Sequence, residues 1–355
     1  MRTPSLTFLK QLVDAPSPSG YERPAAKVYT DYVSEFADKV STDVSGNVFA
    51  ILNPDAKMKI MLAGHMDEIG FIIHYIDENG LLYFSTIGGH DSVVPIGQRV
   101  WVHGRERLTG VVGRKAIHLL DPAELKKKPS FTDLWIDIGA TSRADAEAVL
   151  QLGDVVTFQY GFQPLLGDLA TARAFDNKAG VFIVGEAMRI LKQQGGLRKD
   201  VGVYSVATVQ EEIGSRGAKT AAFALGAQTG LAVDMGHARD IPGISLRQHG
   251  RLDVGKGPGV SRGANTNHAV FALIAAAASD ENIPYQTTVT PGTSPTDAQA
   301  LQINKSGMAA GLMEIPLRYM HTPCEVLSLV DVESCARLMA AYCRKISPGT
   351  SLVPG

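Results

Sequence analysis

The feature of this sequence that most constrains its fold is an alternation of helix-like and strand-like segments that stops mid-chain and later resumes. Helical spacing marks residues 4–14 and 22–38, and apolar runs at 48–52 and 59–63 are typical of strands. After residue 167, helices are expected at 176–194, 215–224, 265–279 and 330–346, with strands at 201–209, 231–233 and 308–315. This alternation favours an α/β fold with a mostly parallel sheet flanked by helices.

The middle of the chain has a different pattern. Turn-forming clusters separate short strand-like segments at 71–76, 81–84, 99–103, 110–112, 134–138 and 154–160, and only 143–152 has helical spacing. Such a pattern is typical of an all-β unit. We therefore expect residues 1–73 and 168–355 to form one domain, which carries the chemistry, with residues 74–167 inserted as a small β-rich domain.

Composition and charge exclude several classes of protein. Hydrophobic residues make up 45% and charged residues 20%, which excludes wholesale disorder, and a net charge of −2 lacks the basic excess of a nucleic-acid binder. No apolar run reaches the roughly 18 residues of a membrane span, and Lys10 and Asp14 interrupt the only candidate signal peptide. The three cysteines are odd in number and lack C-x-x-C spacing, so we expect a cytoplasmic protein without disulfides, nucleic-acid partners or membrane partners.

Polar side chains follow the predicted strands at the points where these end. In open α/β sheets, ligands bind just beyond the carboxyl ends of the strands. The residues at these positions include two imidazoles and several carboxylates, a combination typical of a divalent metal site, zinc above all, with cobalt or manganese as alternatives. They are His65, Asp67, Asp176 (which opens the helix at 176–194), Glu211, Glu212, Asp234 and His321.

Each of these residues also has a purely structural explanation when taken alone. Asp176 could cap its helix, and Glu211 and Glu212 could favour a helix dipole. A single histidine is more often buried and hydrogen-bonded than a ligand, and Asp234 could end its strand in a turn. Independent structural roles would not place polar residues so regularly at the same ends of successive strands, so the metal interpretation is preferred.

The number of candidate ligands suggests two metal ions. Five ligands are too many for one tetrahedral zinc that keeps a position open for water, but they suit a pair about 3.5–4 Å apart if one carboxylate bridges. Each ion then has one histidine, one terminal carboxylate and the shared carboxylate. Asp67 could orient the His65 ring, and Glu211 remains free to act as a general base.

Several segments match one family in order along nearly the whole chain. The segments are 63–71 (AGHMDEIGF), 174–180 (AFDNKAG), 211–218 (EEIGSRGA), 234–236 (DMG) and 318–323 (RYMHTP), with 18–22 (PSGYE) near the start. Together they resemble the metal and base motifs of the tetrahedral (deblocking, glutamyl-type) aminopeptidases, a family of co-catalytic dinuclear zinc metallopeptidases.

The resemblance implies a role for each site residue. Asp176 bridges the metals, Glu212 and His321 bind one of them, and His65 and Asp234 bind the other. Glu211 is the general base, and Asp67 orients His65. The resemblance also implies that the β insertion serves dimerisation and that dimers assemble into a hollow tetrahedral dodecamer.

Two segments depart from the family pattern. Residues 295–300 (PTDAQA) correspond to a motif that is richer in glycine in relatives, and His90 stands where relatives commonly have an aromatic residue. No preference for the side chain of the substrate is therefore assigned.

The expected reaction is hydrolysis of the first peptide bond of short peptides, by a metal-activated water whose proton Glu211 accepts. The closest alternative is a metallo-carboxypeptidase or deacylase, which needs a cationic clamp from residues such as Arg216, Arg251 or Arg262. A glycoside hydrolase (endoglucanase-type) using Glu211 and Glu212 leaves both histidines idle, and consecutive side chains on an extended segment point apart. A non-catalytic peptide-binding or scaffold protein that uses the β insertion is a further alternative.

Overall fold

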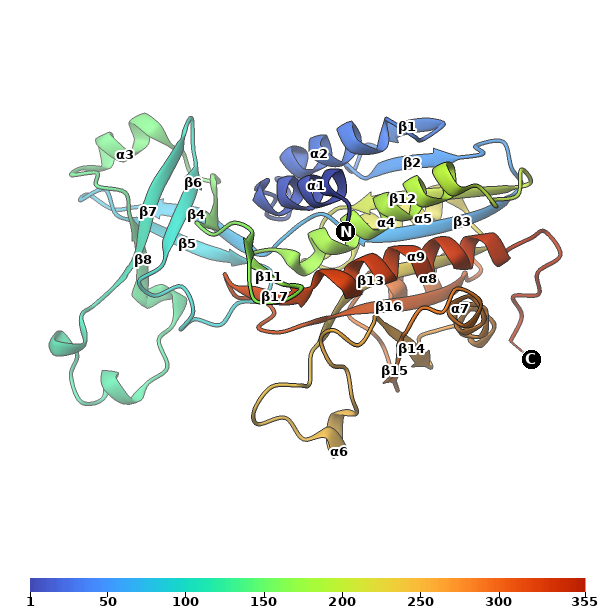
Figure 1. The fold of residues 1–355 in the computed structure, drawn as a ribbon. Helices are drawn as coiled ribbons and strands as arrows, with labels where there is room; N and C mark the ends of the chain where they lie inside the picture. The colour runs from blue at the N-terminus through green and yellow to red at the C-terminus, as the bar shows by residue number, and fades with distance from the viewer. Residues whose placement is uncertain (355) are drawn as a thin grey trace.

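An eight-stranded mixed sheet organises the larger part of the molecule in the computed structural model, which describes residues 1–354 (Figure 1). The sheet has the order β1-β2-β12-β3-β13-β16-β14-β15. Its central strands β12, β3, β13 and β16 are parallel, as are β14 and β15, whereas β1–β2, β2–β12 and β14–β16 are antiparallel. In sheet order, the strands span Lys39–Thr42, Val48–Leu52, Val201–Thr208, Met58–His65, Thr229–His237, Ala309–Leu317, Gly259–Gly263 and Gln286–Thr290.

Helices cover both faces of this sheet. One face packs against α1 (Thr3–Asp14), α2 (Arg23–Val33), α4 (Phe175–Gln194), α7 (His268–Asp280) and α9 (Leu329–Lys345). The other packs against α5 (Arg216–Leu225) and α8 (Asp297–Gln302). Side-chain caps fix the starts of three of these helices, since Asn267, Thr296 and Ser328 accept hydrogen bonds from backbone N–H groups in the first turn of α7, α8 and α9.

A closed β-barrel forms the other part of the molecule, on the left in Figure 1. Its strand order is β4-β5-β8-β7-β6-β9, and closure leaves no unpaired sheet edge. An apolar cluster that includes Phe71, Phe84 and Ile136 fills the interior. In barrel order, the strands span Gly70–Ile76, Leu82–Ile87, Leu134–Asp137, Arg107–Arg114, Arg99–His103 and Val155–Phe158, with helix α3 at Arg143–Val149.

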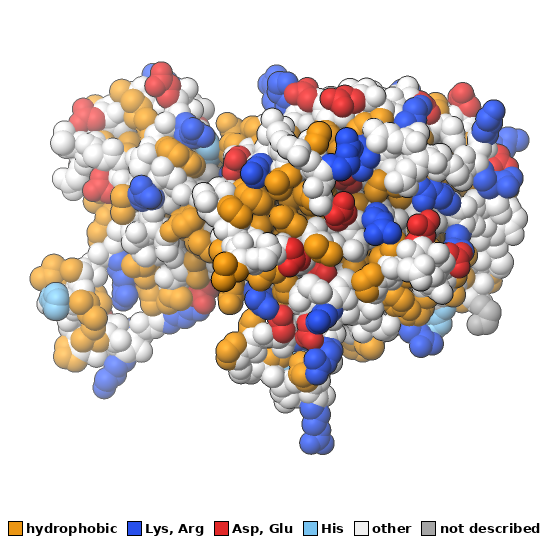
Figure 2. All heavy atoms as spheres, viewed as in Figure 1, with side chains coloured by type: hydrophobic (Ala, Val, Ile, Leu, Met, Phe, Trp, Pro, Cys, Tyr) orange, Lys and Arg blue, Asp and Glu red, His pale blue; other side chains and the backbone are white. Residues whose placement is uncertain are grey.

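Short elements complete the described chain. A three-stranded sheet of β10 (Gln163–Pro164), β11 (Leu169–Ala172) and β17 (Glu325–Ser328) lies between the barrel and the large sheet (Figure 1), and α6 (Leu246–His249) lies on an extended loop. One-turn helices at Ile117–Leu119, Glu124–Lys126 and Phe131–Asp133 lie in the β7–β8 loop. That loop projects from the molecule with apolar side chains on its surface, at the lower left in Figure 2, and Ile117, Leu119 and Leu125 are exposed.

The predicted fold class is confirmed: an α/β sheet flanked by helices with an inserted small all-β domain. The sheet is parallel only in its centre and between β14 and β15, and the prediction missed β1, β14 and β15 because these short strands lie near the sheet ends and carry weak apolar patterns. The helix predicted from the spacing of residues 22–38 was too long, since α2 ends at Val33. The barrel strands run from Gly70 to Phe158, while the boundaries at 73/74 and 167/168 stay a prediction.

No helix among residues 1–354 is both long enough and apolar enough to cross a membrane. All three cysteines are free in the described chain.

Candidate metal centre

The seven residues singled out in the sequence come together at the carboxyl edge of the central strands. His65 ends β3, Asp234 lies near the end of β13, and Glu211 and Glu212 follow β12. His321 follows β16, and Asp176 lies in the first turn of α4. Ligand atoms of two groups, His65–Asp176–Asp234 and Asp176–Glu212–His321, lie within 4.8 Å of one another in each group. Asp176 therefore belongs to both groups, and each group has one imidazole.

The spacing of these atoms is that of ligands around a cation. His65 Nε2 lies 3.4 Å from Asp176 Oδ1 and 3.7 Å from Asp234 Oδ1. His321 Nε2 lies 3.4 Å from Asp176 Oδ2 and 3.6 Å from Glu212 Oε2. These distances exceed those of good hydrogen bonds, but two ligands about 2.0–2.1 Å from a tetrahedral zinc are themselves separated by about 3.4 Å.

The charges of the two groups also fit divalent cations. Burial together with the charge of Asp176 raises the pKa of Glu212 well above its usual value, and burial also raises the pKa of Asp234. Burial lowers the pKa of His65, but the surrounding carboxylates of Asp176, Asp234 and Asp67 outweigh it and raise that pKa. Asp176 Oδ1 and Glu212 Oε1 are buried without a hydrogen-bond partner. Buried carboxylates with unpaired oxygens need positive charge, and the donor set of imidazoles and carboxylates suits zinc.

Asp67 holds the candidate base and one candidate ligand through their main chains. Its Oδ1 accepts the N–H of Glu211 at 2.9 Å, and its Oδ2 accepts the N–H of Glu212 at 3.1 Å. His65 Nδ1 lies 3.1 Å from the carbonyl oxygen of Asp67 and 3.4 Å from its Oδ1. Because a carbonyl only accepts, this contact puts the ring proton on Nδ1 and leaves the Nε2 lone pair for a cation.

Glu211 lies beside the first group and is part of neither. Its Oε2 is 3.7 Å from His65 Nε2, and its Oε1 accepts a hydrogen bond from the Ser215 hydroxyl at 3.1 Å. Burial raises the pKa of Glu211 to about 8, and the charge of Asp234 adds to this while His65 opposes it. A carboxyl in this position can take a proton from a molecule bound beside His65.

Glu325 was not predicted, and it connects two of the three candidate ligands of the second group, Asp176 and His321. Its Oε2 accepts the N–H of Asp176 and its Oε1 the N–H of His321, both at 3.0 Å, and only 2% of the residue is exposed. An acidic residue at the start of the buried strand β17, four positions after His321, was the available signal.

A buried ion-pair cluster next to the site was also missed. The Glu68 carboxylate contacts Lys178 Nζ at 2.7 Å and the Arg173 guanidinium, and all three side chains are buried. Glu68 also accepts the backbone N–H of Ser17 at 2.9 Å. The cluster ties the segment after His65 to the segment around Asp176 and to the end of α1, so it holds two ligand-bearing segments together.

The backbone around the site is in unusual conformations. Ala174, Gln210, Ser215 and His321 have positive φ values between 50° and 61°, although none is glycine. Left-handed conformations cost about 1–2 kcal/mol for such residues and persist only where the surrounding structure imposes them. Strain of this kind gathers at functional sites.

A cleft of about 780 Å³ opens over the two groups. Its wall includes Pro295, Thr296, Gln299 and Ala300, so the segment that departs from the family pattern lines the cleft. His90, the other departure, packs instead: its Nε2 lies 2.9 Å from the Gly70 carbonyl, and its ring stacks on Phe71. None of Arg216, Arg251 and Arg262 lines the cleft, whereas Lys219 and Arg239 do.

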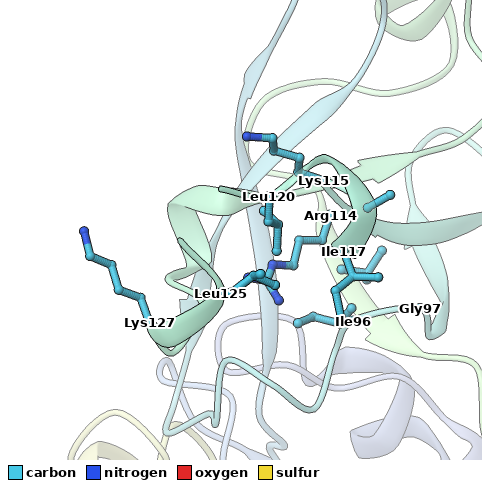
Figure 3. Close-up of a pocket in the computed structure, with 10 residues that line it drawn as sticks. Ile96, Gly97, Arg114, Lys115, Ile117, Leu120, Leu125 and Lys127 are labelled. Atoms are coloured by element: carbon cyan, nitrogen blue, oxygen red, sulfur yellow. The ribbon is translucent and has the colours of Figure 1, made fainter. Parts of the chain in front are cut away.

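A second hollow of about 410 Å³ lies between the barrel and the β7–β8 loop (Figure 3). Its lining combines apolar side chains such as Ile117 and Leu125 with Arg114, Lys115 and Lys127, of which Lys127 points away from it (Figure 3). The lining has no carboxylate and no histidine, so it offers no ligand for a metal.

Comparison with known proteins points to one family. The model of the M42 glutamyl aminopeptidases matches residues 46–338. The chain is 32% identical over 348 residues to a lysyl aminopeptidase of Pyrococcus furiosus, covering 96% of this chain and 97% of the relative. A TET aminopeptidase from the marine sediment archaeon Thaumarchaeota archaeon SCGC AB-539-E09 superposes with a TM-score of 0.93 at 35% identity and 98% coverage of both chains.

A third match concerns assembly. The TET1 peptidase of Pyrococcus horikoshii, which can assemble into a tetrahedron or a large octahedral shell, has a TM-score of 0.85 at 30% identity, covering 96% of this chain and all of that one. The family match spans most of the chain, and it agrees with the resemblance in the sequence motifs. The chain therefore belongs to the M42 family of glutamyl aminopeptidases and is a peptide hydrolase.

Proposed function

We propose that the protein is a dinuclear metallo-aminopeptidase that removes N-terminal residues from short peptides. Asp176 would bridge two divalent ions, with His65 and Asp234 as further ligands of one, and Glu212 and His321 as further ligands of the other. The observation that carries this proposal is the pair of His-Asp/Glu groups that share Asp176. Zinc suits the donor set best, with cobalt or manganese as alternatives.

The proposed chemistry divides between the metals and the protein. When bound, two divalent ions would activate a water molecule and polarise the scissile carbonyl. Glu211 would accept the proton of the attacking water and return it to the amine of the leaving peptide. Asp67 and Ser215 would keep the Glu211 carboxyl aimed at that water, since Asp67 accepts its backbone N–H at 2.9 Å and Ser215 donates to its Oε1 at 3.1 Å.

We also propose that the chain forms a homo-oligomer, in which the inserted domain of residues 74–167 makes dimer contacts and dimers build a tetrahedral dodecamer. The assembly of the related TET1 peptidase supports this, as do the exposed apolar residues of the β7–β8 loop. A cytoplasmic location stays a prediction from the sequence.

The test combines metal analysis with substrates that differ only at the N-terminus. We expect about two divalent ions per chain, hydrolysis of leucine nitroanilide, and no hydrolysis of its N-acetylated form. Chelation should abolish the activity, and added zinc, cobalt or manganese should restore it. Equal hydrolysis of the acetylated substrate would reject an aminopeptidase, and full activity in a metal-free protein would reject the metal mechanism.

A further inference from the structure

One carboxylate in the cleft has no part in the proposed metal site or in proton transfer. Glu314 lies on β16, directly beside Asp234 on the parallel strand β13, and it lines the cleft. Its neighbours two and four positions back, Leu312 and Ala310, pack against the face covered by α5 and α8, so the Glu314 side chain lies on that face. Among the described residues that line the cleft, the other acids are those already assigned to the metals or the base.

Glycines on both flanking strands make room for the Glu314 side chain. A Cβ at Gly236 would lie 3.1 Å from Glu314 Cβ and 3.3 Å from its Oε1, and a Cβ at Gly259 would lie 3.2 Å from Glu314 Cβ. Any larger residue at either position would crowd the carboxylate. The two glycines therefore leave a slot in the sheet, which the Glu314 side chain occupies.

One oxygen of the Glu314 carboxylate has a hydrogen-bond partner in the described chain and the other has none. The Thr288 hydroxyl donates a hydrogen bond to Oε2, whereas Oε1 has no hydrogen-bond partner among residues 1–354 and is not sealed from solvent. A carboxylate oxygen held in a half-buried slot without a partner makes a strong acceptor for a charged donor, because such bonds gain strength away from bulk water.

The distance from the metal groups suits the side chain of a substrate rather than its backbone. Glu314 belongs to neither metal group, and it is one strand beyond Asp234, or about 4.8 Å in the sheet. The four-carbon stem of lysine or the longer side chain of arginine can cover such an offset from a substrate Cα held near the metals.

The cations of the cleft wall are engaged with carbonyl groups. Arg239 donates a hydrogen bond to the carbonyl oxygen of His249, and Lys219 donates one to that of Gly214 at 3.0 Å. No ion pair joins either of them to Glu314 in the described chain. Oε1 of Glu314 is therefore left for a ligand.

We propose that Glu314 selects peptides whose N-terminal residue has a cationic side chain, lysine or arginine. This inference rests on the proposed aminopeptidase function and names its substrate class. The N-terminal side chain would extend along the cleft from the metal groups, with its charged group against Oε1 of Glu314.

The test compares nitroanilides of lysine, arginine, norleucine, leucine and glutamate on the metal-loaded wild type, on Glu314→Gln and on Glu314→Leu. Norleucine is the matched neutral analogue of lysine. Wild type should prefer lysine to norleucine by about 10- to 100-fold in kcat/KM, the range expected for one charged hydrogen bond. Glu314→Gln should remove that preference mainly through KM, with less than about 3-fold change for leucine and norleucine. Glu78→Gln, an exposed glutamate of the barrel, serves as the control and should leave the preference unchanged.

Four outcomes would overturn the inference. A wild type that hydrolyses leucine nitroanilide without preferring lysine or arginine would reject it alone and leave the aminopeptidase intact. A uniform loss across all substrates in Glu314→Gln would mean that Glu314 holds the α-amine or the fold, and a preference for glutamate would assign recognition to Arg239 instead. Hydrolysis of none of the substrates by wild type would reject the proposed function, and this inference with it.

Discussion

The barrel and the cleft edge of the sheet bury residues of opposite character. Between Gly70 and Phe158, the buried polar residues are Ser92, His103 and Thr157, and each has a hydrogen-bond partner. At the cleft edge, several carboxylates and histidines are buried, and not all of their polar atoms have a hydrogen-bond partner in the described part of the protein. Asp176 and Glu212 each retain an unpaired carboxylate oxygen.

The backbone conformation also differs between the barrel and the cleft edge. Residues of the barrel with positive φ are glycines, whereas Ala174, Gln210, Ser215 and His321 adopt positive φ around the cleft. A region that serves mainly to fold can follow local preferences throughout. A region that binds and reacts departs from them, and the rest of the structure must stabilise it.

The largest effect on metal content and activity should come from replacing Asp176, the carboxylate that belongs to both metal groups. Asp176→Asn removes a charge that both metal groups use, so we expect metal content to fall from about two ions to one or fewer, with activity lost by about 10³-fold or more. Metal analysis and nitroanilide assays measure both. Two retained ions would contradict a bridging role.

Glu211→Gln should separate catalysis from metal binding. We expect both ions to stay bound while kcat falls by about 10²- to 10⁴-fold, because only the proton acceptor is lost. Glu78→Gln on the barrel is the matched control. Near-normal turnover in Glu211→Gln would show that another group takes the proton.

In the barrel, Phe84→Ala should reduce stability without changing the metals. Phe84 is 3% exposed and packs edge-to-face on Phe71, so its truncation should lower the free energy of unfolding by about 3–5 kcal/mol. Denaturant unfolding measures this, with the more exposed Tyr75→Ala as the control. Loss of metals from the still-folded variant would show that the barrel core also supports the metal site.

Glu325→Gln should weaken metal binding moderately. The amide can accept only one of the two N–H bonds from Asp176 and His321, so we expect metal affinity to fall by about 10- to 100-fold. Competition with a chelator measures the affinity, and the surface variant Glu281→Gln controls for the loss of charge. Unchanged affinity would reduce Glu325 to a packing role.

The smallest expected effect is a change in the stability of the protein with pH, caused by His103 of the barrel. Burial, with the nearby charge of Arg173, lowers the pKa of His103 from 6.5 to about 4. The unfolded chain therefore takes up a proton as pH falls below 6.5, while the folded chain does not until about pH 4, so stability declines as pH falls through this window.

Between pH 7 and pH 5 this decline should be on the order of 1–2 kcal/mol, and His103→Gln should remove it. Urea unfolding of both proteins at the two pH values gives the difference. Identical pH dependence in wild type and variant would show that folding does not lower the pKa of His103.

Much of the candidate site was predictable because each residue follows a strand with a clear apolar pattern. His65, Glu211, Asp234 and His321 could be assigned to one edge of the sheet once parallel strands were expected, since such strands end at the same side. Asp67 was predicted to orient His65 through its carboxylate. In the structure the Asp67 Oδ1 lies 3.4 Å from His65 Nδ1, and the same carboxylate also accepts the N–H groups of Glu211 and Glu212. These two further contacts, across 144 and 145 residues of chain, were not predicted.

By itself, the amino-acid sequence determined the α/β class, the interrupted strand–helix order and the set of candidate ligands, because periodicity and strand ends are local properties. Tertiary structure alone decided which strands become neighbours. Pairing of β13 with β16 puts Glu314 beside Asp234, 80 residues apart, and the return of β17 brings Glu325 under Asp176 and His321. Such contacts depend on how distant segments pack around a common core, and a pattern read along one segment contains no information about its partner.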